Sequence, residues 1–139
     1  MKALLVCTHG SSAKELVNSA EMICGKQENQ TSVAFTMGES PDKLEQELKK
    51  KISTLDLSDG ILCLTDLKGG TPFNTLVRLT QSIPQLHILT GVSIPMLLEF
   101  FIQREQYKMP DLIESTIKAA HDGIYQYVFT ENTTDNEEF

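Results

Sequence analysis

Short apolar runs alternate along this 139-residue chain with segments of helical periodicity. Four of these runs have the length and composition of a strand, and we predict strands at residues 2–8, 31–36, 61–65 and 86–90. The run at 61–65 is apolar almost throughout, which is typical of a strand covered on both faces. Strands joined through helices favour parallel pairing with right-handed crossovers. We therefore predict an α/β fold, an open and mainly parallel sheet with helices on both faces.

Start signals and periodicity define the predicted helices. Ser12 and Glu15 have capping-box spacing, and residues 40–41 and 71–72 each combine an N-cap residue with proline. The first helix is expected to end with a C-terminal cap at Gly25. Two further helices are predicted, one that begins at Pro95 and one at 111–120 that stops at Gly123. The predicted core positions are Leu16, Val17, Ala20, Ile23 and Cys24, then Leu44, Leu48 and Ile52, then Phe73, Leu76, Val77 and Thr80, and finally Met96, Leu97, Phe100 and Phe101.

The C-terminal part breaks the alternation of strand and helix. Residues 124–129 are rich in Tyr, Val and Phe and follow two consecutive helices. We predict that they add an antiparallel strand at a sheet edge. One domain is expected at 1–129, followed by an acidic flexible tail at 130–139 that carries four of the chain's negative charges.

Composition narrows the functional classes. The chain is 40% apolar with a mean hydropathy of −0.16, and no apolar run reaches the roughly 18 residues of a membrane span. The N-terminus lacks a cleavable signal pattern, so a cytoplasmic protein is expected. The net charge is −7, and nothing in the sequence suggests the clustered Lys and Arg residues that a nucleic-acid site would need. Cys7, Cys24 and Cys63 lie in apolar stretches without C-x-x-C spacing, which predicts buried reduced thiols.

Two titratable residues each close an apolar run. His9 ends the first run before Gly10, and Asp66 ends the run at 61–65. Ligands of open parallel sheets bind outside the carboxyl ends of the strands. If the Asp66 carboxylate accepts a hydrogen bond from one imidazole nitrogen, the other keeps a lone pair for attack. Proton or phosphoryl chemistry is therefore expected at this pair.

Residues around both strand ends suit a phosphate. Gly10, Ser11 and Ser12 precede or begin the first helix, where free N–H groups and the helix dipole favour an anion. Gly70 permits close backbone approach, and Thr71 offers a hydroxyl. The nucleotide-binding patterns G-x-x-x-x-G-K-[ST] and G-x-G-x-x-G are absent. No cofactor or metal is expected. For His87 and His121 we expect structural or surface roles.

Three motifs carry a family resemblance. They are T-H-G at 8–10, G-G-T-P-F-N at 69–74 and G-V-S-I-P-M at 91–96. Together they make the chain resemble the mannose-family IIA components of the bacterial sugar phosphotransferase system, over about residues 2–128. That family has a parallel sheet covered by helices on both faces and an extra C-terminal strand.

The resemblance implies a phosphocarrier function. His9 would be phosphorylated, at Nε2, with Asp66 as its orienting partner, and Thr71 occupies the family's hydroxyl position. The histidine-containing phosphocarrier protein would be the donor. The acceptor would be a IIB component on a separate chain, working with membrane sugar-transport subunits. The resemblance also implies a homodimer that exchanges its last strand, while the sugar is left open.

Three other functions fit parts of the pattern. A phosphotransfer subunit serving dihydroxyacetone kinase would use the same histidine with another acceptor. A histidine phosphatase also places a histidine after its first strand, but it requires an adjacent arginine to hold the phosphate, and this chain has Thr8 in that place. A non-catalytic flavodoxin-like binding module predicts no covalent phosphate on His9.

Overall fold

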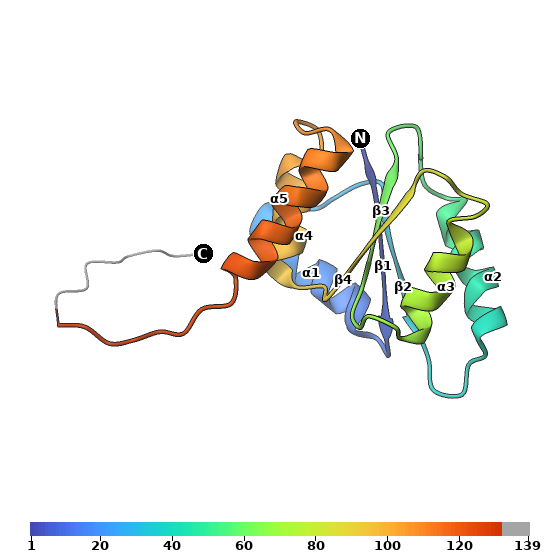
Figure 1. Ribbon diagram of the computed structural model, residues 1–139, viewed down its shortest axis with the longest axis horizontal. Helices are drawn as coiled ribbons and strands as arrows, with labels where there is room; N and C mark the ends of the chain where they lie inside the picture. The colour runs from blue at the N-terminus through green and yellow to red at the C-terminus, as the bar shows by residue number, and fades with distance from the viewer. Residues whose placement is uncertain (132–139) are drawn as a thin grey trace.

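A four-stranded parallel sheet forms the centre of the computed structural model, which describes residues 1–131 (Figure 1). The strand order is β2-β1-β3-β4. The strands are β1 (Ala3–His9), β2 (Gln30–Phe35), β3 (Ile61–Thr65) and β4 (Leu86–Thr90). The carboxyl ends of β1 and β3 therefore lie side by side at the middle of one sheet edge, with β2 beyond β1. The predicted parallel α/β fold is confirmed.

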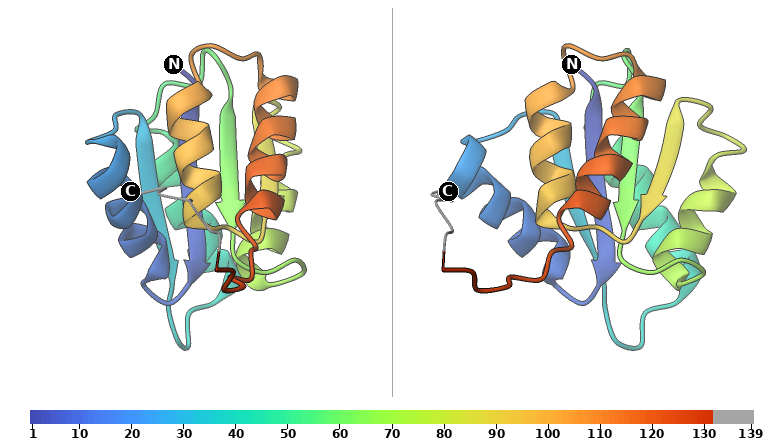
Figure 2. Two further views of the ribbon diagram at one scale, coloured as in Figure 1. Left: turned by 90° about the vertical axis from the view of Figure 1, so that its left-hand side faces the viewer. Right: turned by 60° about the vertical axis from the view of Figure 1, so that its left-hand side comes forward.

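Five helices cover the two faces of the sheet. They are α1 (Ser12–Cys24), α2 (Pro41–Ile52), α3 (Thr71–Leu79), α4 (Ile94–Gln103) and α5 (Met109–Asp122). Figures 1 and 2 show α1, α4 and α5 on one face and α2 and α3 on the other. Helices α1, α2, α3 and α4 each follow a strand and so begin at the carboxyl edge of the sheet. No helix among residues 1–131 is long and apolar enough to cross a membrane.

The alternation of side chains along the strands divides the core into two layers. Leu5 and Cys63 face α2 and α3, whereas Leu4 and Leu64 face α1, α4 and α5, and all four are fully buried. This two-sided burial explains why the strands read as continuous apolar runs. The predicted core positions of α2 and α4 are confirmed.

Four local predictions about helices are wrong. Ser12 is no N-cap, because Ser11 takes that place without a side-chain cap and the Ser12 hydroxyl donates to Thr8 Oγ1 at 2.7 Å. Ile23 is 49% exposed, since it lies on the outer side of the last turn of α1. Helix α3 has Gly70 rather than Thr71 as N-cap. Leu76 is buried as predicted, but Val77 is 44% exposed, and the other buried residues of the helix are Pro72, Thr75 and Leu79.

A buried arginine ties together the amino edge of the sheet. Arg104 follows α4 and is 2% exposed. Its guanidinium donates to the carbonyl oxygens of Lys2 at 3.1 Å and Glu28 at 2.8 Å, and to Gln27 Oε1 at 3.0 Å. It also lies over the Phe101 ring, 5.3 Å from the centroid. Arg104 thus links the starts of β1 and β2 to the end of α4.

The predicted C-terminal strand is not formed. The chain from 124 to 130 has no regular secondary structure and leads away from the sheet (Figure 1). Ile124, Tyr125, Tyr127, Val128 and Phe129 are all exposed. Strand-type composition alone makes no strand, because a strand needs a neighbouring backbone for its hydrogen bonds. The sheet is therefore wholly parallel over the described residues, and most of the predicted tail at 130–139 lies outside them.

Candidate active site at the carboxyl edge

His9 and Asp66 meet where β1 and β3 end. The two strands pair in parallel, and Asp66 directly follows β3. The Nδ1 atom of His9 lies 2.9 Å from Oδ2 of Asp66. The backbone N–H of His9 donates to the same oxygen at 3.0 Å. One carboxylate oxygen therefore holds both the peptide and the ring of His9.

The charge of Asp66 sets the hydrogen-bonding pattern of the ring. Partial burial raises the pKa of the Asp66 carboxyl, but the hydrogen bonds from the side chain and backbone of His9 outweigh it, and the pKa lies below its ordinary value. An ionised carboxylate only accepts hydrogen bonds, so Nδ1 is the donor. In the tautomer with the proton on Nδ1, the free lone pair of the ring lies on Nε2, and this is the ring atom that can act as a nucleophile.

Two neighbours fix the plane of the imidazole. Phe35, at the end of β2, meets the ring edge-on at a centroid distance of 5.7 Å and an angle of 76°. On the loop before α3, Gly70 comes so close that a Cβ there would lie 2.9 Å from Cε1 of His9. The side chain of His9 nevertheless remains 46% exposed. The ring is oriented by its surroundings and still accessible to a second molecule.

Two helices begin near His9. Helix α1 begins three residues after His9, and α3 begins next to Gly70. The first N–H groups of a helix have no partner within it, and the helix dipole adds positive potential. The first backbone hydrogen bond of α3 runs from Asn74 N to Gly70 O at 2.9 Å. A phosphoryl group on Nε2 would be stabilised in this environment.

The remaining predicted phosphate-binding residues divide into two groups. Gly10 lines the hollow of about 310 Å³ beside His9, and Gly70 contacts its ring. Ser11 instead lines a separate hollow of about 190 Å³ towards β2, and the Ser12 hydroxyl is directed to Thr8. Thr71 is the first residue of α3 and makes no side-chain cap. Their phosphate-binding roles stay predictions.

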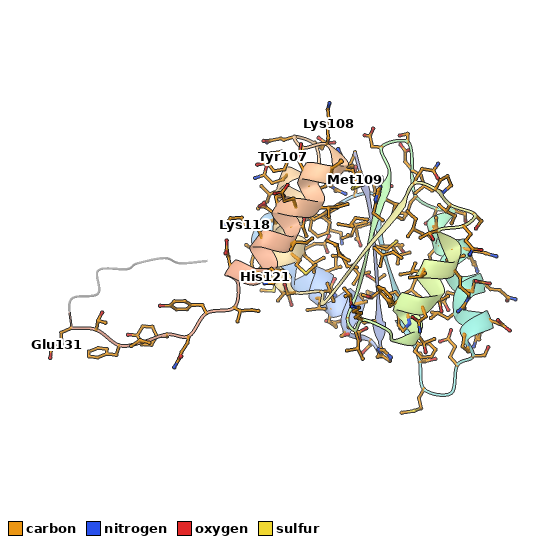
Figure 3. All side chains as sticks on the ribbon, viewed as in Figure 1. Tyr107, Lys108, Met109, Lys118, His121 and Glu131 are labelled. Atoms are coloured by element: carbon orange, nitrogen blue, oxygen red, sulfur yellow. The ribbon has the colours of Figure 1, made fainter. Side chains whose placement is uncertain are left out.

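The other nucleophiles and histidines lie outside this arrangement. Burial raises the pKa of the Cys7 thiol to about 12, so it stays protonated near neutral pH. His87 and His121 are exposed, as predicted for surface residues. Figure 3 shows His121 on α5 together with Lys118, whose ammonium group binds Asp122 at 2.6 Å. Residues 1–131 contain no group of three His, Cys, Asp or Glu side chains arranged to hold a metal ion.

Sequence reasoning missed Phe35 as part of the site. The strand register places Phe35 opposite His9, but that pairing depends on β2 being the neighbour of β1. An aromatic residue at the end of the second apolar run was the available signal.

Comparisons with known proteins identify the family of this chain. The family model EIIA-man, described as the PTS system fructose IIA component, matches residues 3–117. The mannose-specific EIIAB component of Escherichia coli K12 is 32% identical over 123 residues, which cover 88% of this chain and 38% of that longer protein. The chain thus spans about two-fifths of this relative. The fructose-specific EIIA component of Bacillus subtilis is 28% identical, covering 91% of this chain and 86% of the relative.

Solved structures show the same architecture. The component EIIA from Streptococcus agalactiae superposes with a TM-score of 0.82 at 30% identity, covering 91% of this chain and 97% of that one. The mannose/sorbose-specific IIA subunit from Enterococcus faecalis has a TM-score of 0.85 at 24% identity, covering 96% and 100% of the two chains, and supports the fold. The chain therefore belongs to the EIIA-man family, the mannose, fructose and sorbose type of phosphotransferase-system IIA components.

Proposed function

We propose that this chain is a phosphocarrier that accepts a phosphoryl group on Nε2 of His9 and passes it on. The donor is the histidine-containing phosphocarrier protein, and the acceptor is a IIB component that serves sugar uptake. One observation carries the proposal: Asp66 Oδ2 binds both the ring Nδ1 and the backbone N–H of His9. This arrangement leaves Nε2 as the reactive atom.

In the proposed transfer, a phosphoryl group moves from the imidazole of the donor to the imidazole of His9, and each bond that forms replaces one that breaks. The lone pair of Nε2 attacks phosphorus in line with the donor's P–N bond. As the Nε2–P bond forms, that bond breaks and its electron pair stays on the donor nitrogen. A donor ring that carries a proton on its other nitrogen leaves as neutral imidazole. The phosphorylated His9 ring keeps its proton on Nδ1, and Asp66 stabilises the positive charge it acquires.

A labelling experiment tests the proposal. Purified phosphorylated carrier protein should label the wild-type chain, and the His9→Ala variant should remain unlabelled. His87→Ala and His121→Ala are matched controls, because both histidines are exposed and lie outside the site. Both controls should label at the wild-type rate. Full labelling of His9→Ala would refute the proposal.

The arginines argue against the phosphatase alternative. The chain has two arginines, Arg78 and Arg104. Arg78 pairs with Glu45 between α3 and α2 at 3.6 Å, and Arg104 is at the amino edge. Thr8, the residue before His9, is fully buried. A guanidinium group that would hold phosphate for hydrolysis is thus missing beside His9 in the described part of the chain.

We further propose a homodimer in which residues 124–129 of each chain pair with the sheet of the other. The support is the apolar character and the exposure of this segment, with Tyr125 78% and Phe129 75% exposed. Pairing in a twofold dimer would bury these side chains and supply the hydrogen bonds of a strand. The antiparallel edge strand predicted from sequence would then form between two chains.

A further inference from the structure

The sheet has an open edge along β2. This strand is the first in the order β2-β1-β3-β4 and pairs with β1 alone (Figure 2). Asn29 O, just before β2, accepts from Leu4 N at 3.1 Å, and Phe35 O, at the end of β2, accepts from Gly10 N at 2.8 Å. Because backbone groups alternate in direction along a strand, the odd-numbered residues of β2 face β1 and the even-numbered ones face outwards.

The outward backbone groups of β2 are unpaired. The N–H and C=O groups of Gln30, Ser32 and Ala34 make no hydrogen bond to any of the residues 1–131. Such an edge can accept another extended chain as an additional strand. Two hollows border it, one of about 300 Å³ and one of about 190 Å³, and Lys14 and Ser32 line both. A groove therefore follows β2 along the side of α1.

Lysines surround this groove. Lys14 on α1, Lys26 after α1 and Lys51 at the end of α2 all line the larger hollow. None of the three forms an ion pair within the described part of the chain. Glu21 also lines the hollow, but its Oε2 accepts from Gln27 N at 2.8 Å. Positive charge therefore prevails in the groove, although the chain as a whole has a net charge of −7.

The lysines flank the edge from both faces of the sheet. Lys14 and Lys26 lie on the side of α1, whereas Lys51 belongs to α2, which covers the other face (Figure 2). A strand added to β2 would direct its side chains alternately to these two faces. Acidic side chains on either face of that strand would then meet a lysine. Residues 124–129 have no charged side chain, so they would leave these lysines unpaired.

We infer that the β2 edge is a docking groove for an extended acidic segment of a partner protein, which adds to the sheet beside β2 and places its carboxylates against the lysines of the groove. The free backbone groups of Ser32 and Ala34 supply the hydrogen bonds, and the lysines supply the preference for an acidic sequence. The chain's own acidic residues at 131–139 match less well, because the segment before them leads away from the sheet (Figure 1). They and residues 124–129 of a second copy are the rival occupants.

The test uses the full chain and two blocked peptides that are long enough to span β2. One peptide alternates Glu with Thr. The other alternates Glu with Pro, which keeps half of the residues acidic but removes the N–H donors of the other half. Fluorescence anisotropy of labelled peptides gives the dissociation constants. NMR measurements of amide exchange report on Ser32 and Ala34.

Three variants separate charge from strand addition. Lys14→Gln/Lys51→Gln removes charge from both sides of the groove. Lys68→Gln/Lys108→Gln is the matched control, because these lysines also lack an ion pair among residues 1–131 but line neither hollow. Ser32→Pro removes one outward N–H, and proline is tolerated on an edge strand where the N–H faces solvent.

The Glu-Thr peptide should bind wild type and slow the exchange of the Ser32 and Ala34 amides. Lys14→Gln/Lys51→Gln and Ser32→Pro should each weaken this binding about tenfold, the control variant should match wild type, and the Glu-Pro peptide should bind at least about tenfold more weakly.

Three results would overturn the docking groove. With no saturable binding of the Glu-Thr peptide up to about 1 mM, or equal binding of the two peptides, the lysines would only keep other strands away or attract charge. Tighter peptide binding by a chain that lacks 132–139 would make the chain's own acidic residues the occupant. Dissociation of a dimer in light scattering when the peptide is added would assign the β2 edge to a second copy.

Discussion

Asp66 binds His9 twice through a single oxygen, because Oδ2 accepts from the ring Nδ1 at 2.9 Å and from the backbone N–H at 3.0 Å. Asp66→Asn should therefore fold but accept phosphate on the order of a hundredfold more slowly or worse, since a neutral amide stabilises the phosphorylated ring less. Rapid-quench labelling measures the rate. A chelator should leave the wild-type rate unchanged. Strong inhibition by the chelator, with the carrier protein itself unaffected, would instead indicate a metal.

The lowered pKa of Asp66 predicts how this pair affects stability at acid pH. The folded chain holds this carboxyl below its ordinary pKa, so the unfolded chain binds the proton more readily. The stabilisation is therefore complete above about pH 4 and is lost as the pH falls through the lower folded pKa. Urea unfolding of wild type and Asp66→Asn should differ most near neutral pH and converge at low pH. A difference that stays constant from pH 7 to pH 3 would contradict this.

Gly70→Ala should disturb His9 by direct contact, and the added Cβ would also lie 3.2 Å from the backbone oxygen of Leu67. Gly70 has an ordinary φ of −71°, but the added Cβ would lie 2.9 Å from Cε1 of His9. We expect a shifted imidazole resonance in NMR spectra and slower labelling. Gly69→Ala is the opposite case, with open space but a φ of +80°. It should cost roughly 1–2 kcal/mol of stability with the ring environment retained. Identical ring spectra for wild type and Gly70→Ala would refute the contact.

Arg104→Met should destabilise the fold by about 2–4 kcal/mol, because it removes the hydrogen bonds that the buried guanidinium donates to the partly buried carbonyl oxygens of Lys2 and Glu28. Arg78→Met is the control, since Arg78 is 49% exposed and its ion pair with Glu45 should contribute less than about 1 kcal/mol. Urea unfolding gives both values. The folded Arg104→Met protein should label normally, and a loss of stability no larger than that of Arg78→Met would contradict the role of Arg104.

Truncation tests the proposed exchange of residues 124–129. A chain that ends at Gly123 should be monomeric or insoluble, because it lacks the proposed fifth strand. Removing 132–139 alone should change little. Light scattering at micromolar concentration reports the outcome directly. A monomeric full-length chain under these conditions would end the dimer proposal.

The strands were predictable from short-range pattern, and parallel pairing predicts that His9 and Asp66 end their strands at the same edge of the sheet. That β1 and β3 are neighbours, so that the two residues meet, is known only from the structure. Apolar runs with helical connections restrict the topology, and residues that end adjacent parallel strands share one edge. The roles of the two residues in phosphoryl transfer stay predictions. Their hydrogen bond is observed.

The errors concern interactions that depend on three-dimensional neighbours. Ser12 had the spacing of a capping box, but its hydroxyl found Thr8 at the end of β1, which is a choice among competing local partners. Phe35 joins the site because β2 lies beside β1, and the sequence does not state strand order. Residues 124–129 have strand composition without a strand to pair with.

Three of the four helices that begin at the carboxyl edge carry proline in their first turn, namely Pro41, Pro72 and Pro95. Because the pyrrolidine ring fixes φ near its helical value, these helix starts have little conformational freedom to lose when a partner binds. For the relay proposed above, the free energy of the phosphoryl bond would then pass between proteins with little of it spent on rearranging this one. In such a relay, the direction of transfer would depend on the phosphoryl-transfer potentials and the relative amounts of the phosphorylated donor and acceptor, and not on a rearrangement of this chain.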